Sequence, residues 1–188
     1  MNPIMAILTD TNTNTEAKGY IPTDSCRTTS SSKVSCAPAV HGADTVTFQT
    51  FETFPELYAA YLDKVEQVSG ERPSMDQMAV GDCNSTMSSG EVTWNHRYQH
   101  PRTFMISQLE TGRYQSDVAG GRLFCVLVEG REHIIWTHND IKMLGEVTGY
   151  GSHSETFQWW KLMHHNMGPM AGMNEDMPSP TASMAPDM

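Results

Sequence analysis

The sequence predicts an α+β domain in which two similar β-hairpin-plus-helix halves form one antiparallel sheet. The first observation is the stretch GGRLFCVLVEGREHIIWTHND at residues 120–140, which is typical of a strand, a tight turn and a second strand. The second is a looser version of the same order, KVSCAPAVHGADTVTFQTF, at residues 33–51. The third is a capping box after each hairpin, which predicts that a helix begins there.

The first half contains the clearest helix. Strands are expected at KVSC, from Lys33, and at residues 45–51, where β-branched and aromatic residues alternate with polar ones. Thr53 and Glu56 form the first capping box, and Gly70 is expected to end the helix. The apolar residues between them define one amphipathic face, formed by Phe54, Leu57, Tyr58, Tyr61, Leu62, Val65 and Val68.

The second half predicts a meander of three strands, GGRLFCVLV, EHIIWTH and IKMLGEVTG. Ser152 and Glu155 form the second capping box and begin the helix ETFQWWKLM, whose aromatic side is expected to be buried. A further strand is expected around residues 92–98, residues 103–112 fit either a strand or a short helix, and residues 70–90 are interpreted as a connector.

The two halves agree in spacing. Cys36 precedes Phe48 by 12 positions, and Cys125 precedes Trp136 by 11, with a glycine turn between them in each case. The second half inserts one extra strand before its helix. We therefore interpret the domain as a duplicated unit.

Composition divides the chain of 188 residues into three parts. Residues 1–18 are expected to be a flexible N-terminal arm, and residues 19–162 the α+β domain. Residues 163–188 are rich in Met, Pro, Gly and acidic residues, a composition that forms no core, so we expect a disordered tail. The N-terminus has a short apolar patch without a basic region, so no signal peptide is visible.

Charge and hydropathy exclude two kinds of partner. The net charge is −10 and no cluster of Lys or Arg is present, so the chain would repel a phosphate backbone and we expect no nucleic-acid partner. No stretch approaches about 18 consecutive apolar residues, so we expect no membrane span.

The chain has four cysteines, Cys26, Cys36, Cys83 and Cys125. None forms a CxxC pair or lies near a histidine at zinc-finger spacing. An even number of widely spaced cysteines fits two disulfides and an oxidising compartment. Four reduced thiols that pack in the core of a cytoplasmic protein fit equally well.

The order of short motifs resembles the extracellular C-terminal region of actinobacterial eukaryotic-like serine/threonine protein kinases and related free-standing exported proteins. The matching motifs are YIP, SCAP, GADTVTF and LYAAY, followed by GDC, TW, GRLFC, HIIWT, ML and WW. They cover roughly residues 19–162, and the Met-rich tail is not part of the resemblance. This chain lacks the kinase domain and membrane helix that precede the region in that family, and its stretch 95–119 is longer than the pattern leads us to expect.

The resemblance implies a non-catalytic, sensor-like module that faces the outside of the cell and binds an unknown small ligand or protein. It also implies the disulfides Cys26–Cys36 and Cys83–Cys125, each of which would stabilise the fold by about 2–4 kcal/mol. The tryptophans would cover one face of the sheet, with indole N–H groups near the surface or a partner. This aromatic packing or binding face comprises Trp94, Trp136, Trp159 and Trp160.

The sequence contains no complete catalytic motif of a kinase. The glycine-rich loop, catalytic Asp and metal-binding Asp of a kinase are missing, so we expect no phosphoryl transfer and no enzyme activity. A small hydrolase remains an alternative hypothesis, with a cleft lined by His96, His100 and His133.

Copper binding by the C-terminal tail is a second alternative hypothesis. Thioethers suit Cu(I) and imidazoles suit Cu(II), so a Met- and His-rich tail in an oxidising compartment is typical of a copper scavenger. The candidate ligands are Met163, His164, His165, Met167, Met170 and Met173.

Overall fold

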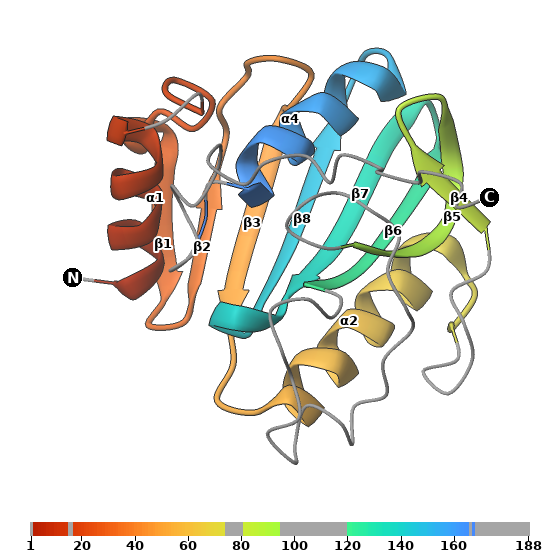
Figure 1. The fold of residues 1–188 in the computed structure, drawn as a ribbon, viewed down its shortest axis with the longest axis horizontal. Helices are drawn as coiled ribbons and strands as arrows, with labels where there is room; N and C mark the ends of the chain where they lie inside the picture. The colour runs from red at the N-terminus through yellow and green to blue at the C-terminus, as the bar shows by residue number, and fades with distance from the viewer. Residues whose placement is uncertain (1, 15–16, 74–80, 95–119, 166, 168–188) are drawn as a thin grey trace, which may run out of the picture.

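The computed structural model describes residues 2–14, 17–73, 81–94, 120–165 and 167 (Figure 1). Within them the chain forms one eight-stranded antiparallel sheet with the order β1-β2-β3-β8-β7-β6-β5-β4. The expected α+β class with an antiparallel sheet is therefore confirmed. The strands are β1 (Cys26–Ser30), β2 (Lys33–Cys36), β3 (Thr45–Thr50), β4 (Gly81–Asn84), β5 (Met87–Trp94), β6 (Gly121–Val128), β7 (Arg131–His138) and β8 (Met143–Gly149).

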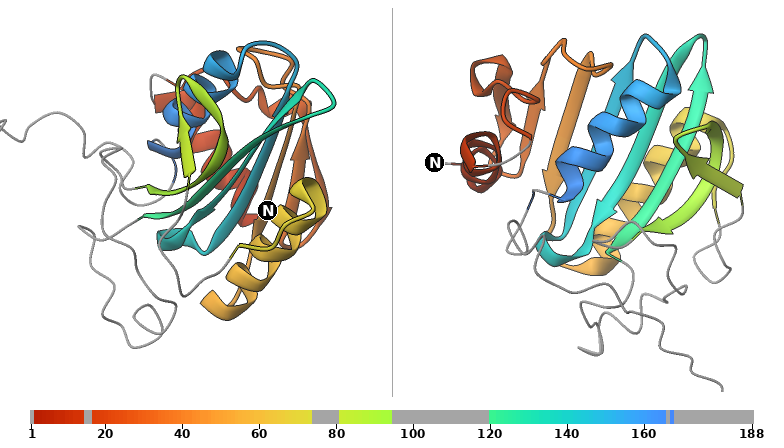
Figure 2. Two further views of the ribbon diagram at one scale, coloured as in Figure 1. Left: turned by 90° about the vertical axis from the view of Figure 1, so that its right-hand side faces the viewer. Right: turned by 45° about the horizontal axis from the view of Figure 1, so that its top comes forward.

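Helices cover both faces of this sheet. Helix α2 (Phe54–Ser69) packs on one face against β6, β7 and β8. Helices α1 (Pro3–Asn14) and α4 (His153–His165) lie on the opposite face, as Figure 2 shows. Two 3-10 turns, η1 (Thr23–Ser25) and η2 (Asn139–Ile141), complete the described elements. None of the described helices is long and apolar enough to cross a membrane.

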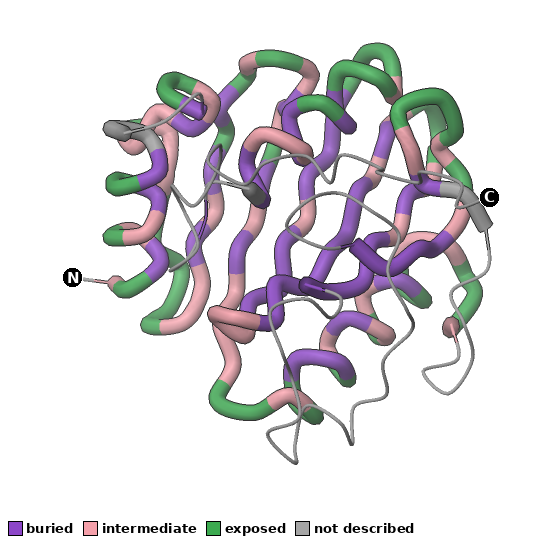
Figure 3. The backbone as a smooth tube through the Cα atoms, in the orientation of Figure 1, coloured by how far each residue is buried: buried purple, intermediate pink, exposed green. Residues whose placement is uncertain are grey.

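Each face of the sheet has its own apolar core. In Figure 3 the buried residues follow the central strands and the sides of the helices that face them. The larger core lies on the α1 and α4 side and includes Phe48 and Trp136, and the smaller one lies under α2 and includes Leu57 and Ile135. The sheet is thus the middle of three layers, as a strand alternation with two apolar faces requires.

Local sequence signals fix the ends of both central helices. Before α2, the Glu56 N–H donates to Thr53 Oγ1 and the Thr53 N–H donates to Glu56 Oε2 at 3.1 Å, and Gly70 ends the helix at φ 79°. Before α4, the Glu155 N–H donates to Ser152 Oγ and the Ser152 N–H donates to Glu155 Oε2, both at 3.3 Å. Both predicted capping boxes are confirmed.

The β6–β7 hairpin has the geometry that its sequence predicts. Val128 pairs with Arg131, so Glu129 and Gly130 form a two-residue turn, with φ of 50° and 76°. Two positive φ values are typical of the turn that matches the right-handed twist of paired strands. β8 then pairs with β7, which confirms the three-stranded meander.

The N-terminal arm is an error of the sequence analysis. Residues 3–14 form α1, and Ile4 and Leu8 on it are fully buried in the larger core. Asn2 caps the helix, because its Oδ1 accepts the Ile4 N–H at 2.9 Å, and Pro3 occupies the first helical position. The second half of α1 is polar, and its buried apolar residues are spaced one turn apart on one side only. The sequence therefore gives a weak helix signal here.

The connector at residues 70–90 is a second correction. It contains β4 and the first half of β5, whose polar and glycine-rich residues carry no strand signal. The strand expected around residues 92–98 is present as the end of β5, up to Trp94. Residues 103–112 lie outside the described residues.

The boundary of the tail also moves. Helix α4 continues to His165, and Met163, His164 and Met167 are buried in the larger core. The physical reason is that Met163 and His164 continue the helical spacing of Phe157 and Trp160, so their side chains fall on the buried face, and Met167 joins the same core just after the helix ends. The packed part of the chain therefore extends to Met167 rather than ending at residue 162.

The duplication of the two halves is not confirmed. Cys36 and Cys125 both belong to the larger core. However, α2, which follows the first hairpin, packs on the opposite face from α4, which follows the second. The two helices therefore do not occupy equivalent places relative to the cysteine-bearing strands.

Candidate functional site

The predicted aromatic face is the packing layer beneath α4. All four tryptophans are at most 1% exposed. Trp136 meets the edge of Phe48 with ring centroids 6.0 Å apart, and Trp94 meets the edge of Trp160 at 6.1 Å. Such edge-to-face pairs are typical of aromatic residues in cores. The structure thus gives this set a packing role.

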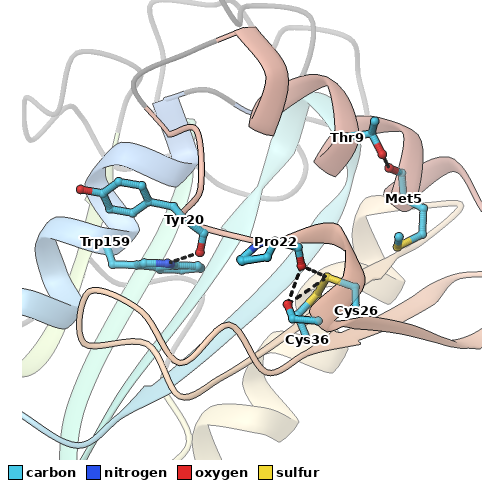
Figure 4. Close-up of a disulfide and its surroundings, with 8 residues drawn as sticks. Met5, Thr9, Tyr20, Pro22, Cys26, Cys36 and Trp159 are labelled. Carbon is cyan, nitrogen blue, oxygen red and sulfur yellow. Dashed lines mark hydrogen bonds between the residues drawn. A yellow bond between two sulfur atoms is a disulfide. The ribbon is translucent and has the colours of Figure 1, made fainter.

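Two of the indole N–H groups bond within the protein, contrary to the expectation that they lie near a surface or partner. Trp94 Nε1 donates to the Thr137 carbonyl at 2.9 Å. Trp159 Nε1 donates to the Tyr20 carbonyl at 3.1 Å, as Figure 4 shows. These bonds tie α4 and β5 to neighbouring segments.

The expected copper ligands are partly core residues. The His164 ring stacks on Trp160 at 3.9 Å and its Nδ1 lies 3.0 Å from the Trp160 carbonyl oxygen, while Met163 and Met167 are buried nearby. The side chain of His165, and Met170 and Met173, lie outside the described residues. Three of the six predicted ligands are therefore core residues, and the side chains of the other three lie outside the described residues.

The Cys26–Cys36 disulfide joins the edge strand β1 to its neighbour β2. Cys26 on β1 and Cys36 on β2 are register partners with Cα atoms 4.0 Å apart. Figure 4 shows the bond close to the segment that carries Tyr20 and Pro22. This disulfide locks the outermost strand.

The Cys83–Cys125 disulfide joins the other edge. Cys83 lies on edge strand β4 and Cys125 on β6, so the bond reaches past β5, with the Cα atoms 5.5 Å apart. Gly90, the β5 partner of Cys125, has φ 130°, which is open mainly to glycine. Both disulfides predicted from the resemblance are present with the pairing that it implies.

A buried ion pair lies beside this second disulfide. Glu132 on β7 is on the same face of the sheet as Cys125, as its diagonal neighbour across the β6–β7 ladder. His153 is the first residue of α4, and its Nδ1 lies 2.9 Å from Glu132 Oε1. The Glu132 side chain is 1% exposed and that of His153 is 12% exposed. A carboxylate this deeply buried requires a partner.

The disulfide and the histidine–glutamate pair come together from four elements, β4, β6, β7 and α4. His153 Nε2 bonds to the carbonyl oxygen of Asn84, which follows Cys83 on β4. The Cys125 sulfur, a Glu132 oxygen and a His153 nitrogen all lie within 4.8 Å of one another. Among the described residues, this is the one group of three or more His, Cys, Asp or Glu side chains with metal-ligand spacing.

The contacts of His153 favour its charged form. Burial opposes its charge most strongly, but the hydrogen bond to Glu132 and the carbonyls of Asn84 and Met87 outweigh burial and raise the pKa of His153 above its usual value. Both ring nitrogens lie close to oxygen atoms, Nδ1 to Glu132 Oε1 and Nε2 to the Asn84 carbonyl. The histidine and the glutamate are therefore partners inside the fold, beside the disulfide.

The sequence analysis did not identify Glu132 and His153 as a site. The available signal was the period-two alternation of β7, in which Glu132 shares its face with the apolar residues Ile134 and Trp136. A carboxylate in such a position indicates a buried partner. The sequence did not reveal which histidine it was, because His153 is 21 positions away and on a helix.

A second buried polar network lies under α2. Arg122 binds Glu91 through Nε at 3.0 Å and a terminal guanidinium nitrogen at 2.8 Å, and the Tyr61 hydroxyl donates to Glu91 at 2.6 Å. The Tyr58 hydroxyl donates to Asn139 Oδ1 at 2.8 Å. Burial, with the Glu91 charge, raises the pKa of Tyr61 well above its ordinary value. This network anchors α2 on the sheet.

Of the three histidines predicted to line a hydrolase cleft, the structure describes only His133. His133 lies on the α2 face, where its Nδ1 is 3.5 Å from Glu146 Oε1. His96 and His100 lie outside the described residues.

No family model, curated protein sequence or solved structure matches the chain. Function has to follow from the chemistry of the side chains and from the motifs.

Proposed function

We propose that the chain is a non-catalytic, sensor-like or ligand-binding module exposed to an oxidising compartment. In this proposal it resembles the extracellular regions of actinobacterial serine/threonine kinases and takes a small ligand or a protein as its partner. The observation that carries the proposal is the disulfide pairing, since Cys26–Cys36 and Cys83–Cys125 are the pairs that the motif resemblance implies.

The placement of the disulfides supports a location outside the cytosol. One bond holds each edge of the sheet, β1 at one end and β4 at the other. Edge strands expose unpaired backbone groups and are prone to fraying and to pairing with other chains. Covalent closure at both edges is a typical solution for exported domains, where thiols oxidise and persist as disulfides.

The state of the buried polar groups supports binding over catalysis. A catalytic base must be able to take a proton from a substrate. His153 is instead held by its contacts with Glu132 and the Asn84 carbonyl, and Tyr61 donates to Glu91 beneath α2. Their charges and hydrogen bonds are used inside the fold, which favours a structural frame that presents a binding surface.

The test has two parts. The first is a peptide mass map, with and without reduction, of the protein purified from its natural host. We expect the peptides of Cys26 with Cys36 and of Cys83 with Cys125 to be linked in the unreduced sample. Free thiols at all four positions would place the protein in a reducing compartment and remove the export part of the proposal.

The second part addresses binding. The indole N–H signals of the ¹⁵N-labelled protein would be followed by NMR during titration with low-molecular-mass fractions of the host growth medium. A saturable shift, with the fraction chemically unchanged afterwards, supports a ligand-binding module. Conversion of a component by the protein, absent in a heat-inactivated sample, would contradict the non-catalytic assignment.

A further inference from the structure

The Cys83–Cys125 disulfide differs from the Cys26–Cys36 disulfide in its neighbours. Glu132 and His153 lie beside Cys125, and a sulfur, an oxygen and a nitrogen from these three residues are within 4.8 Å of one another. Cys83 is bonded to Cys125, so its sulfur is next to the same cluster. Three potential ligand atoms from β6, β7 and α4 are thus held together, and the Cys83 sulfur on β4 is bonded to one of them.

We propose that reduction of the Cys83–Cys125 disulfide converts this cluster into a zinc site, with Cys83, Cys125, Glu132 and His153 as the four ligands. The inference concerns the reduced protein and does not require the domain to be a sensor. Two thiolates with an imidazole and a carboxylate form a donor set that suits Zn²⁺, whereas Mg²⁺ and Ca²⁺ prefer oxygen ligands alone.

The conversion is a balanced reaction. A dithiol reductant gives two protons and two electrons to the disulfide, the Cys83–Cys125 sulfur–sulfur bond breaks, and the dithiol closes to its own disulfide. Zn²⁺ then binds as the two thiols release their protons and His153 coordinates through a neutral imidazole nitrogen, because ligands bind the metal in their deprotonated forms. The oxidised form cannot bind in this way, since its sulfurs are bonded to each other.

The geometry requires small movements. In a tetrahedral site with Zn–S bonds of about 2.3 Å, the two sulfurs lie about 3.8 Å apart, which is close to van der Waals contact after the bond breaks. His153 Nδ1 and Glu132 Oε1 lie 2.9 Å apart, and a nitrogen and an oxygen of these two residues lie within 4.8 Å of the Cys125 sulfur. The nitrogen–oxygen distance has to open by a few tenths of an ångström to reach the roughly 3.3 Å of adjacent light ligands.

The surroundings supply the support that metal ligands need. His153 Nε2 bonds to the Asn84 carbonyl, so Nδ1, the nitrogen that faces Glu132, is the one positioned for the metal. A backbone carbonyl on the far nitrogen is a common way to orient a ligating histidine. The ion would also neutralise Glu132, which is 1% exposed and lies 2.9 Å from His153 in the oxidised protein.

The other disulfide provides a matched control in the same chain. Among the residues that the structure describes, Cys26 and Cys36 belong to no group of three or more side chains with metal-ligand spacing. The full-length variant Cys26→Ser/Cys36→Ser therefore keeps the proposed site, and Cys83→Ser/Cys125→Ser removes it. Both variants lose one disulfide, so their difference reports the site rather than the loss of a crosslink.

The experiment measures Zn²⁺ affinity by competition with a chromophoric chelator, using protein reduced by a phosphine that is then removed. The reduced Cys26→Ser/Cys36→Ser variant should bind one Zn²⁺ per chain, about 100-fold or more tightly than its oxidised form. The reduced Cys83→Ser/Cys125→Ser variant should show no such gain. Co²⁺ in place of Zn²⁺ should give the intense visible bands of a tetrahedral site with thiolate ligands.

Further variants separate a built site from two thiols in a loosened chain. Glu132→Gln and His153→Gln should each weaken Zn²⁺ binding at least about 10-fold. Glu129→Gln, which changes an exposed turn residue of the same hairpin, should leave the affinity unchanged. Equal affinities for the Glu132→Gln and Glu129→Gln variants would overturn the proposal, as would equal affinities of the oxidised and reduced proteins.

Near-ultraviolet circular dichroism follows the tryptophan core during the same titration. A native spectrum in the reduced, zinc-bound protein supports the site. Loss of the native spectrum on reduction, without recovery when Zn²⁺ is added, would overturn it.

Discussion

Trp136 lies across Gly145. The two residues are register partners on β7 and β8, and a Cβ at position 145 would overlap the six-membered ring of the indole. Phe48 on β3 is the register partner of Gly145 on its other side, and its ring meets the Trp136 edge at 6.0 Å. Because Gly145 has no side chain, Phe48 on β3 and Trp136 on β7 can meet across β8.

The first prediction is that Gly145→Ala destabilises the fold by about 1–3 kcal/mol, as overpacking of a core does. Gly145 is not among the residues with positive φ, so the backbone accepts alanine and the cost is steric. Chemical denaturation measures the effect. In a Trp136→Leu background the same change should cost much less, and an equal cost in both backgrounds would contradict this explanation.

The second prediction concerns acid. Lys64 lies 3.0 Å from Glu146, and His133 lies 3.5 Å from it. Burial opposes the charge on Glu146 most, but the contacts with His133 and Lys64 outweigh it and lower the pKa of this carboxyl. A lowered folded-state pKa adds stability above the unfolded pKa, about 4.3 for Glu, and the addition is lost as pH falls through the folded value.

The variant Glu146→Gln should therefore lose about 1–3 kcal/mol of unfolding free energy near neutral pH and less near pH 3, which lies below the unfolded pKa. Urea unfolding at both pH values checks this. Glu66→Gln is the control, because Glu66 pairs with Arg72 on the exposed side of α2 and such pairs contribute little. A deficit of the Glu146→Gln protein that is the same at both pH values would rule out the linkage.

The third prediction concerns Arg122 and Glu91, which form a buried bidentate pair. Arg122→Met leaves the Glu91 carboxylate buried beside Tyr61 without its cation, and should cost about 3–5 kcal/mol. The double variant Glu91→Leu/Arg122→Met removes both charges and should recover most of that loss. Thermal unfolding of the two variants measures this recovery. A double variant no more stable than the single one would show that the loss comes from packing of the two side chains and not from the unpaired charge of Glu91.

The sequence predicted those parts of the fold whose signals are local. The capping boxes and glycine stop of α2, the positive-φ turn at Glu129 and Gly130, and the period-two strands of the meander each depend on neighbours in the chain. Helix α1 was missed because few of its residues are apolar, and its stability comes from Ile4 and Leu8 in the core rather than from propensity.

The candidate site depends on tertiary structure. Sheet order places β4 and β6 on either side of β5, and the chain path brings the first residue of α4 against Glu132 on β7. Glu132, His153 and the sulfur of Cys125 therefore meet although no spacing in the sequence connects them. The disulfide pairing was predicted from the order of motifs, because spacing alone allows other connectivities.

The fourth prediction concerns where the chain can be cut. A chain that ends at Leu162 lacks Met163, His164 and Met167, all of which are at most 1% exposed in the larger core. Loss of buried groups of this size leaves a cavity against Trp94 and Trp160, and should cost at least about 3 kcal/mol. A chain that ends at Met167 keeps these contacts and should unfold at nearly the temperature of the full chain.

This difference decides how copper binding by the tail is tested. Cu(I) titration should compare the full chain with the chain that ends at Met167, because both retain the same core. Tighter binding by the full chain would assign Cu(I) to ligands beyond Met167, such as Met170 and Met173. Equal affinity would exclude the tail. A weak signal from the chain ending at Leu162 alone would report its unfolding, because thioethers buried in the larger core, such as that of Met143, are not available to a metal in the native protein.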